Sequence, residues 1–383
     1  MFIRRNGIVP RLPFAACLVV GLGLLTHAHA QSLPVLEPSG FIDPPGEGSA
    51  VNGFVFDAND GRALIGLASN TLPIRNGEVF AFSRDANGAW QPDGSLPNPA
   101  PDPDDRFGEA VAIEQDIAVV KATGFGYHVF RRTHSGWTLI QNIEPNAGDE
   151  LLGILSFRHG VVAIGSSSPS GGPGGVYVYR ARGHRLQYVT TLRASDALGS
   201  DGFGFRIALS SDGHTLVASA VTQDDNFTGS AYVFERSGQR WIQTQKLQPE
   251  TEGVLFGDGL AVEGDTLIAG ATIENSAHGA AYVYHRDHHL WQLVQHIQPP
   301  QDLEPDVFAF GNAIAIGPSH VGIGAHFSNS GRAFVYETTA DGLVPSAVIF
   351  APPFFGEQMF FDDTTLLVSS PLEALVHLYE PVL

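Results

Sequence analysis

The sequence is poor in cysteine, in long apolar runs and in basic residues. Its single cysteine, Cys17, stands near the amino terminus, so the rest of the chain can form no disulfide and no thiolate site. The one long apolar run, Ala15 to Leu25, is shorter than the roughly 20 residues that a membrane-spanning helix needs. Only 21 Lys and Arg face 40 Asp and Glu, and the resulting net charge of −19 argues against a nucleic-acid partner.

Residues 1–30 are typical of a secretory signal peptide. Three arginines precede the apolar run, and the small-x-small pattern Ala28-His29-Ala30 follows it. We expect cleavage near Ala30/Gln31 and export to the periplasm, the cell surface or the extracellular space, with no membrane span in the mature chain. Removal of three arginines and no acid would change the net charge from −19 to −22.

What the sequence does contain is a repeat of about 50 residues. Its four tryptophans are 47, 104 and 50 residues apart, and leucines stand at the two places where the repeat lacks a tryptophan. In chain order these positions are Trp90, Trp137, Leu186, Trp241, Trp291 and Leu343. Such a period indicates a repeat architecture, in which each unit is one supersecondary element.

Each repeat predicts four strands. The first begins with a Phe-Gly pair, the second is a short apolar run rich in small residues, the third alternates aromatic and aliphatic residues, and the fourth reads Trp-x-x-x-Gln-x-Leu. The third strand occurs seven times, at 79–82, 127–130, 176–179, 231–234, 281–284, 333–336 and 376–379. The Phe-Gly pair occurs five times, at 107–108, 203–204, 256–257, 310–311 and 355–356.

Four-stranded units of this length predict an all-β fold, a seven-bladed β-propeller of antiparallel blades. The seventh unit ends at Tyr379 without a fourth strand, and residues 33–38 are similar to the end of the fourth strand in other units. We therefore expect the amino-terminal strand to complete the last blade and remove the open sheet edge. The predicted organisation is a signal peptide over 1–30 and a single propeller domain over 31–383.

The Phe-Gly pairs and the phased strands resemble the FG-GAP repeat family, found in integrin alpha-chain heads and in many secreted bacterial proteins. Calcium-binding members of that family carry an Asp-x-Asp-x-Asp-Gly loop between the first two strands of a blade. The nearest match is Asp57-Ala58-Asn59-Asp60-Gly61, so the resemblance implies Ca²⁺ ligands at Asp57, Asn59 and Asp60. An Asx turn without a metal is the alternative, and no other cofactor is predicted.

Acidic residues are concentrated where the fourth strand of one unit leads to the first strand of the next. In a propeller these connections share one face, so we expect a ring of negative potential that attracts cations or basic protein segments. The candidate ligand-binding residues are Asp102, Asp104, Asp105, Asp149, Glu150, Asp196, Asp201, Asp302, Glu304 and Asp306. The alternative is that these acids serve solubility alone.

The leading functional hypothesis is an exported, non-catalytic binding or adhesion scaffold, because the sequence has no linear catalytic motif. Its partner would be a protein or a glycan, and a cationic surface is favoured. A lectin-type, carbohydrate-binding propeller is the second hypothesis, since arginines recur after the third strand and could line pockets with the tryptophans; alternatively each arginine covers the tryptophan of its own hairpin. A secreted hydrolase or lyase is the third. The recurrent arginines are Arg84, Arg132, Arg180, Arg236 and Arg286.

Overall fold

The computed structural model describes residues 33–44, 54–68, 77–101, 106–122, 126–144, 150–167, 174–196, 201–222, 227–300, 307–327, 331–352 and 354–380. The chain divides into two compact units, Met1–Ser32 and Leu33–Leu383. The predicted signal peptide and its cleavage point at Ala30/Gln31 lie outside the described residues. All the strands and sites of the described chain belong to the second unit.

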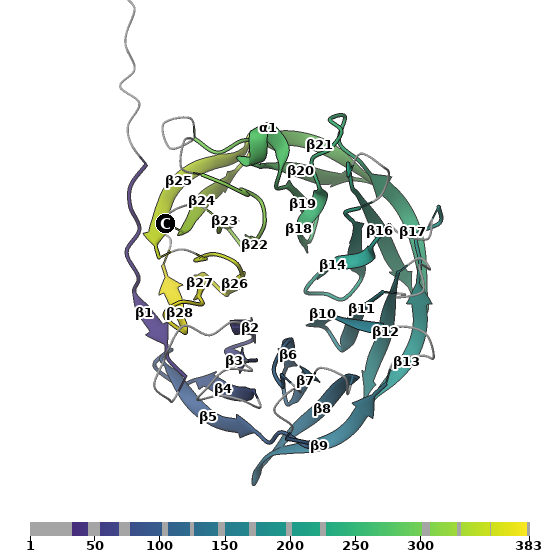
Figure 1. Ribbon diagram of the computed structural model, residues 1–383, viewed down its shortest axis with the longest axis vertical. Coiled ribbons are helices and arrows are strands. Elements are labelled where there is room, and N and C mark those ends of the chain that lie inside the picture. Colours follow the sequence, from purple (N-terminus) through teal and green to yellow (C-terminus); the bar gives the residue numbers. More distant parts are fainter. Residues whose placement is uncertain are drawn as a thin grey trace, which may run out of the picture. The chain divides into compact units, whose positions relative to one another are not determined.

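The second unit is built from seven sheets of four antiparallel strands arranged in a ring, which confirms the predicted β-propeller (Figure 1). From the innermost strand outward, blade 1 is β2 (Phe54–Asn59), β3 (Arg62–Leu67), β4 (Glu78–Arg84) and β5 (Trp90–Leu96), and blade 2 is β6 (Val111–Glu114), β7 (Ile117–Ala122), β8 (Gly126–Thr133) and β9 (Gly136–Ile143). Blade 3 is β10 (Glu150–Arg158), β11 (Val161–Ser167), β12 (Gly175–Arg182) and β13 (Arg185–Leu192), and blade 4 is β14 (Phe203–Leu209), β15 (Thr215–Ala220), β16 (Ser230–Ser237) and β17 (Arg240–Leu247). Blade 5 is β18 (Phe256–Glu263), β19 (Thr266–Ala271), β20 (Ala280–Asp287) and β21 (Leu290–Ile297), and blade 6 is β22 (Ile314–Ile316), β23 (His320–Ala325), β24 (Gly331–Thr339) and β25 (Gly342–Ala351). Blade 7 is β26 (Met359–Asp362), β27 (Thr365–Ser370), β28 (Leu375–Tyr379) and β1 (Gly40–Ile42).

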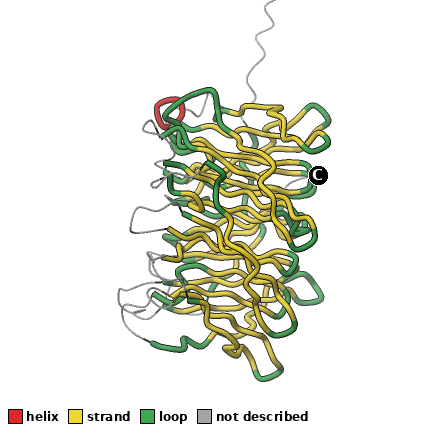
Figure 2. The backbone as a smooth tube through the Cα atoms, turned by 90° about the vertical axis from the view of Figure 1, so that its right-hand side faces the viewer, coloured by secondary structure: helices red, strands yellow, loops and turns green. Residues whose placement is uncertain are grey.

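The antiparallel order divides the turns between two faces. The connections between blades and those between the second and third strands share one face, which we call the connection face. The hairpins between the first and second and between the third and fourth strands share the other, the hairpin face. The short helix α1 (Glu274–Ala277) joins β19 to β20 and therefore lies on the connection face (Figure 2).

The amino-terminal strand closes the ring, as predicted, but at a different register. Strand β1 pairs with β28, with Gly40 opposite Leu378. The segment predicted to close the ring, residues 33–38, instead lies along blade 6, where Val35 forms a parallel bridge with Val348. The physical reason is that Pro34 and Pro38 have no N–H to give to a strand ladder.

The Phe-Gly pair fixes each blade to the one before it. In blade 5, Phe256 is fully buried and packs edge-on against Tyr282 and Tyr284, with ring centroids 5.3 and 6.4 Å away. Gly257 has φ +91°, and a Cβ there would lie 2.7 Å from the Cβ of Ser219 in blade 4. Only glycine permits both this conformation and this approach. The seven apolar clusters of the described residues likewise lie between neighbouring blades.

The glutamine of the Trp-x-x-x-Gln motif also joins neighbouring blades. Gln245 of β17 accepts a hydrogen bond from the backbone N–H of Trp291 at 2.8 Å and donates one to its carbonyl oxygen at 2.9 Å. We call this pair of bonds a glutamine clasp. Gln141 makes it with Leu186, and Gln295 makes it with Leu343. Between blades 3 and 4 the equivalent position is Thr190, which cannot form it.

Candidate functional site

The innermost strands surround a central channel of about 410 Å³. Blades 1 and 3 to 7 all contribute lining residues. Because each innermost strand runs from the connection face to the hairpin face, residues at its start line one end of the channel and residues at its end line the other. The two ends are therefore chemically different.

At the connection end, Asp258 of blade 5 holds Arg206 of blade 4. Nε of Arg206 donates to the backbone carbonyl of Asp258 at 2.7 Å, and Nη2 donates to Oδ1 at 3.2 Å. The hydroxyl of Thr272 donates to the other carboxylate oxygen at 2.8 Å. Both oxygens of Asp258 are thus engaged, and the guanidinium is fixed at the rim of the channel.

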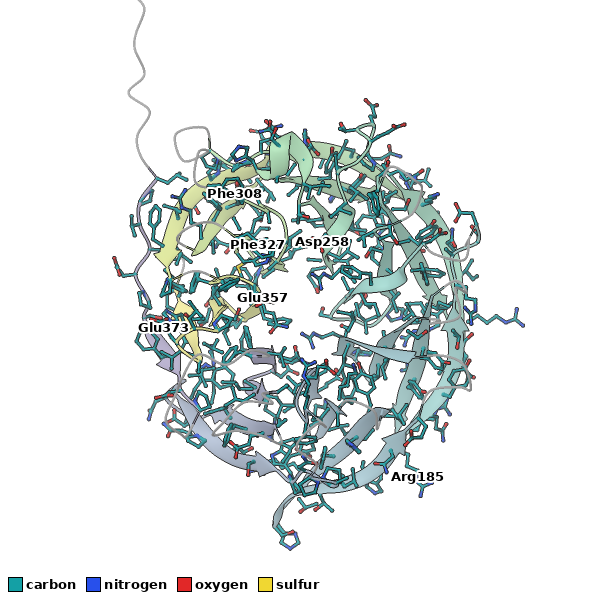
Figure 3. All side chains as sticks on the ribbon, in the orientation of Figure 1. Arg185, Asp258, Phe308, Phe327, Glu357 and Glu373 are labelled. Carbon is teal, nitrogen blue, oxygen red and sulfur yellow. The ribbon has the colours of Figure 1, made fainter. Side chains whose placement is uncertain are left out.

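Blades 6 and 7 add His326 and Glu357 to this end. Burial lowers the pKa of His326 to about 4, with Arg206 adding to the effect and Asp258 opposing it, so the imidazole is neutral at pH 7. Glu357 is exposed to the channel, yet the surrounding protein desolvates it and raises its pKa, against the effect of Arg206. Phe327 is 63% exposed, with its ring 3.8 Å from that of His326. Figure 3 shows Asp258, Phe327 and Glu357 around the centre of the ring. We call Arg206, Asp258, His326, Phe327 and Glu357 the channel mouth.

At the hairpin end, the structure gives Asp57 an arginine as its partner. Nη2 of Arg158 donates to Oδ1 of Asp57 at 2.9 Å, Nη1 donates to Oδ2 at 3.3 Å, and the N–H of Ile113 donates to Oδ2 at 2.9 Å. Burial lowers the pKa of Arg158, but Asp57, with smaller contributions from Glu114 and Glu263, offsets this and the pKa is raised overall. Asp57 therefore links the inner strands of blades 1, 2 and 3.

This arrangement differs from the expected calcium loop. Asp57 and Asn59 lie in strand β2, and only Asp60 and Gly61, with φ of 50° and 69°, form the turn to β3. A two-residue turn of this kind is a hairpin turn, so the three proposed ligands do not share one loop. Among the described residues, no group of three or more His, Cys, Asp or Glu could hold a metal ion.

Most of the predicted acidic ligand residues fall outside the part of the chain that the structure describes. These are Asp102, Asp104, Asp105, Asp149, Asp302, Glu304 and Asp306; Glu150 lies in β10, but its side chain is not described. The remaining two have partners within the protein or are buried. Asp196 accepts hydrogen bonds from the hydroxyl of Tyr232 at 2.8 Å and from Nζ of Lys246 at 2.7 Å. Asp201 is only 5% exposed.

The direction of the pKa shift of Asp196 agrees with its two hydrogen bonds inside the protein. Burial raises it, but the hydrogen bonds from Lys246 and Tyr232 outweigh burial, so the pKa is lowered overall. Asp196 follows blade 3, whereas Lys246 and Tyr232 belong to blade 4. The two hydrogen bonds therefore attach the start of the connection between blades 3 and 4 to blade 4.

The sequence reasoning missed the channel mouth, although a signal for it exists. The residue directly after each Phe-Gly pair lies in or shortly before the start of an innermost strand and is not the same in every blade. These residues are Glu109, Phe205, Asp258, Asn312 and Glu357. Because the pair recurs while the residue after it varies, this position points to candidate site residues, among them Asp258 and Glu357.

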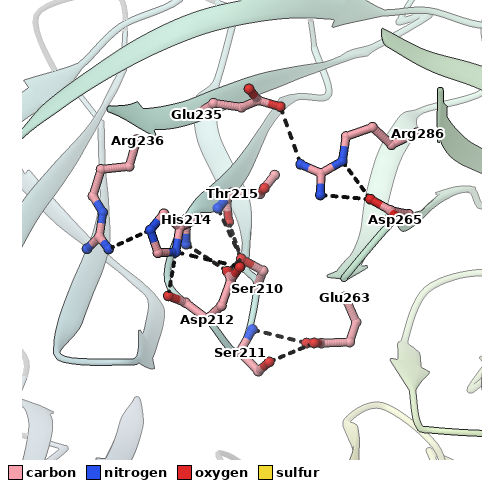
Figure 4. Close-up of polar contacts among 10 residues, drawn as sticks. All are labelled: Ser210, Ser211, Asp212, His214, Thr215, Glu235, Arg236, Glu263, Asp265 and Arg286. Carbon is pink, nitrogen blue, oxygen red and sulfur yellow. Dashed lines mark hydrogen bonds and ion pairs between the residues drawn. The ribbon is translucent and has the colours of Figure 1, made fainter. Parts of the chain in front are cut away.

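A serine, an aspartate and a histidine also meet on the hairpin face, in blade 4 (Figure 4). The hydroxyl of Ser210 donates to Oδ1 of Asp212 at 2.6 Å, while Nδ1 of His214 lies 2.9 Å from the carbonyl oxygen of Asp212. Nucleophilic catalysis by serine requires the hydroxyl to donate to the histidine. The geometry of these three residues is instead that of a turn stabilised by its own side chains.

A family model decides the nature of the repeat. The FG-GAP repeat model matches residues 187–234, which run from β13 in blade 3 to β16 in blade 4. The protein carries an FG-GAP repeat. FG-GAP repeats are typical of extracellular proteins, and no helix among the described residues is long and apolar enough to cross a membrane.

Solved structures show that the propeller fold of this chain is shared with distant proteins. A Bacteroides uniformis protein provisionally named a 6-phosphogluconolactonase is 14% identical, with a TM-score of 0.50 over 76% of this chain and 85% of its own. The computationally designed Ika8 protein is 12% identical, with a TM-score of 0.52 over 88% of this chain and 98% of its own. At these identities the likeness concerns the fold alone. No curated protein sequence matches the chain.

Proposed function

We propose that this protein is an exported, non-catalytic binding or adhesion scaffold that receives a cationic group of a partner protein at the channel mouth. The observation that carries the proposal is the convergence of Arg206, His326 and Glu357, from three different blades, on one end of a 410 Å³ channel. Asp258, from a fourth blade, holds Arg206 in place there. A site built from several blades exists only in the closed ring. It lies on the same face as the predicted acidic connections.

Glu357 favours a cationic ligand. Among the described residues it has no hydrogen-bond or ion-pair partner, and its pKa is raised by burial. An ionised carboxylate in such a position costs folding free energy, which a lysine or arginine side chain from a partner would recover. The exposed ring of Phe327, which packs against His326, offers a face to the methylene stem of that side chain.

The net charge supports the same class of partner. A strongly acidic protein attracts basic segments over distances of about 8–10 Å at physiological salt and speeds their encounter. The lectin-type alternative has less support, because Trp137 and Trp291 are only 6% and 2% exposed. Arg84 and Arg286 cover the tryptophans of their own hairpins, 5.1 and 5.4 Å from the ring centroids.

The proposal is tested by titrating the protein with fluorescent heptalysine at roughly physiological salt. Glu357→Gln removes one carboxylate from the channel mouth, and Glu337→Gln removes one from an exposed position on the hairpin face of blade 6. Both variants change the net charge equally. We expect Glu357→Gln to weaken binding about tenfold and Glu337→Gln to leave it unchanged within a factor of about two.

Equal weakening in both variants, or no saturable binding by the wild-type protein, would show that the channel mouth is not the site. A second comparison concerns the connection face as a whole. Neutralising Asp102, Asp104, Asp105, Asp302 and Asp306 together should slow association and leave the dissociation rate unchanged, because charges at the rim of a site act on the encounter rate. An unchanged association rate would exclude a role for these acids.

A further inference from the structure

The junction between blades 3 and 4 lacks an ion pair that the next junction has. The strand register identifies equivalent positions in the two blades. Thr215 lies opposite Glu235 in blade 4, and Val161 lies opposite Arg180 in blade 3. Arg180 is therefore equivalent to Glu235, and Ala181 is equivalent to Arg236. The sequence pattern that groups Arg180 with Arg236 is one residue out of register.

Between blades 4 and 5 an arginine is fully neutralised. Nη2 of Arg286 lies 2.7 Å from Oδ1 of Asp265, and Nη1 lies 3.6 Å from Oε1 of Glu235 (Figure 4). The guanidinium also covers Trp291 of its own hairpin. Two carboxylates, one from each blade, thus flank one arginine.

Between blades 3 and 4 the two positions that hold carboxylates at the next junction carry basic or neutral groups instead, and Asp212 is a carboxylate that acts on the equivalent arginine, Arg236, without an ion pair. Arg180 stands where Glu235 would be, and His214 stands where Asp265 would be. Nη2 of Arg236 lies 3.3 Å from Nε2 of His214, whose other nitrogen already contacts Asp212 (Figure 4). Nη1 is buried and has no hydrogen-bond partner among the described residues.

The charge balance agrees with this geometry. Burial and the neighbouring charge of Arg180 lower the pKa of Arg236, and Asp212 opposes them only in part. Arg180 itself has no hydrogen bond or ion pair with any described residue. Two arginines held close together without a carboxylate between them are costly for a protein to maintain unless an anion shares the site.

A small cavity lies at this junction. It holds about 30 Å³, and its lining combines Arg180, Arg182 and Arg236 with Tyr179, Trp241 and three valines. A water molecule needs about 10–15 Å³ of such volume, so the cavity accepts a group of about two or three heavy atoms. Thr190 replaces the glutamine of the clasp here, so both inter-blade hydrogen bonds of the clasp are missing at this position.

We propose that the junction between blades 3 and 4 binds the carboxylate of a small organic acid or an acidic sugar through Arg180 and Arg236. The chemistry is taken from the neighbouring junction, where two carboxylates flank the equivalent arginine, Arg286. Paired guanidinium groups match a carboxylate in bidentate geometry, and the size of the cavity admits the carboxylate while the rest of the ligand stays outside. This site is on the hairpin face and is independent of the channel mouth.

The test is a titration of the purified protein with acetate, glucuronate, glucose and phosphate at constant ionic strength, followed by melting temperature and calorimetry. We expect acetate and glucuronate to raise the melting temperature saturably, because a ligand of the native state stabilises it by mass action, and we expect glucose to have no effect. Tighter binding of glucuronate than of acetate would identify the sugar as the source of the carboxylate. Equal binding would identify the organic acid.

Arg180→Glu restores the acid that blade 4 has at this position. We expect it to weaken carboxylate binding at least about tenfold and to raise the melting temperature of the unliganded protein, since it gives Arg236 an ion-pair partner. Arg185→Glu is the matched control, because Arg185 is an exposed arginine at the start of β13 that points away from the ring (Figure 3). It should leave the affinity within a factor of about two.

Three results would overturn the proposal. The first is no saturable effect of either carboxylate beyond that of chloride. The second is tighter binding of phosphate than of both carboxylates, which would mean that the site does not select the carboxylate. The third is a lower melting temperature in Arg180→Glu, which would show that Arg180 stabilises the junction by itself.

Discussion

At the scale of single residues, the Phe-Gly pair separates two tasks. The phenylalanine and the glycine determine how blades stack, and the residue after them lines the channel in blade 6, at Asn312, and in blade 7, at Glu357. Gly311 illustrates the first task, with φ +95° and a Cβ position 2.5 Å from the carbonyl oxygen of Ala280 in the preceding blade. The recurrence of the pair is visible in the sequence. The reason for it is not, because the atom that excludes a side chain belongs to another blade.

Gly311→Ala should lower the free energy of unfolding by about 3 kcal/mol or more, because it adds a steric overlap to the backbone strain of a positive φ. Gly88→Ala is the matched control, since Gly88 has φ +83° but nothing within 4 Å of its Cβ position. The control should lose only about 1 kcal/mol. Urea unfolding of both variants measures the difference, and equal losses would mean that close approach between blades is not what requires glycine.

At the scale of elements, the strands were predictable and some of their contacts were not. The aromatic alternation that predicted Tyr282-Val283-Tyr284 as a strand is confirmed within β20, because local periodicity reflects burial on the two sides of a sheet. The Trp-x-x-x-Gln motif correctly predicts the fourth strand of a blade, but it does not predict the two hydrogen bonds of the glutamine clasp. The clasp's partner is a backbone group in the next blade, 46 residues away for Gln245 and 48 for Gln295.

Gln295→Ala should destabilise the protein by about 1–3 kcal/mol, because it leaves the N–H and carbonyl of Leu343 without their partner. Gln292 lies in the same strand, β21, and is exposed. Gln292→Ala should therefore change stability by less than about 0.5 kcal/mol. Thermal unfolding compares the two, and a similar loss in both would show that the clasp contributes nothing beyond strand propensity.

At the scale of the whole molecule, seven phased repeats were enough to predict the ring, its blade number and its closure by the amino-terminal strand. The candidate site could not be predicted in the same way. Arg206, Asp258, His326 and Glu357 are far apart in the chain and occupy positions that are not all equivalent in their blades. They become neighbours only when the ring closes, so no linear pattern joins them.

The closure of the ring by β1 should contribute to the stability of the protein, and unfolding measurements can detect that contribution. Ile42 is 1% exposed and packs between blades 7 and 1, so Ile42→Ala should cost about 2–5 kcal/mol. Phe41, on the other side of the same strand, is 51% exposed, and Phe41→Ala should cost less than about 1 kcal/mol. Calorimetry should show one unfolding transition for both variants. A separate low-temperature transition confined to Ile42→Ala would contradict a closure that couples the entire ring.

The pairing of β1 with β28 also has a kinetic consequence. Gly40 meets Leu378, so β1 must wait until β28 has been synthesised before it can pair. Contacts between residues so distant in the chain form slowly, since the entropy of closing the loop is lost before the contact is gained. Until then the β28 edge of blade 7 remains unpaired and open to association with other chains. We therefore expect the time needed for one late event, the docking of a single short strand, to set both the folding rate of this propeller and its tendency to aggregate.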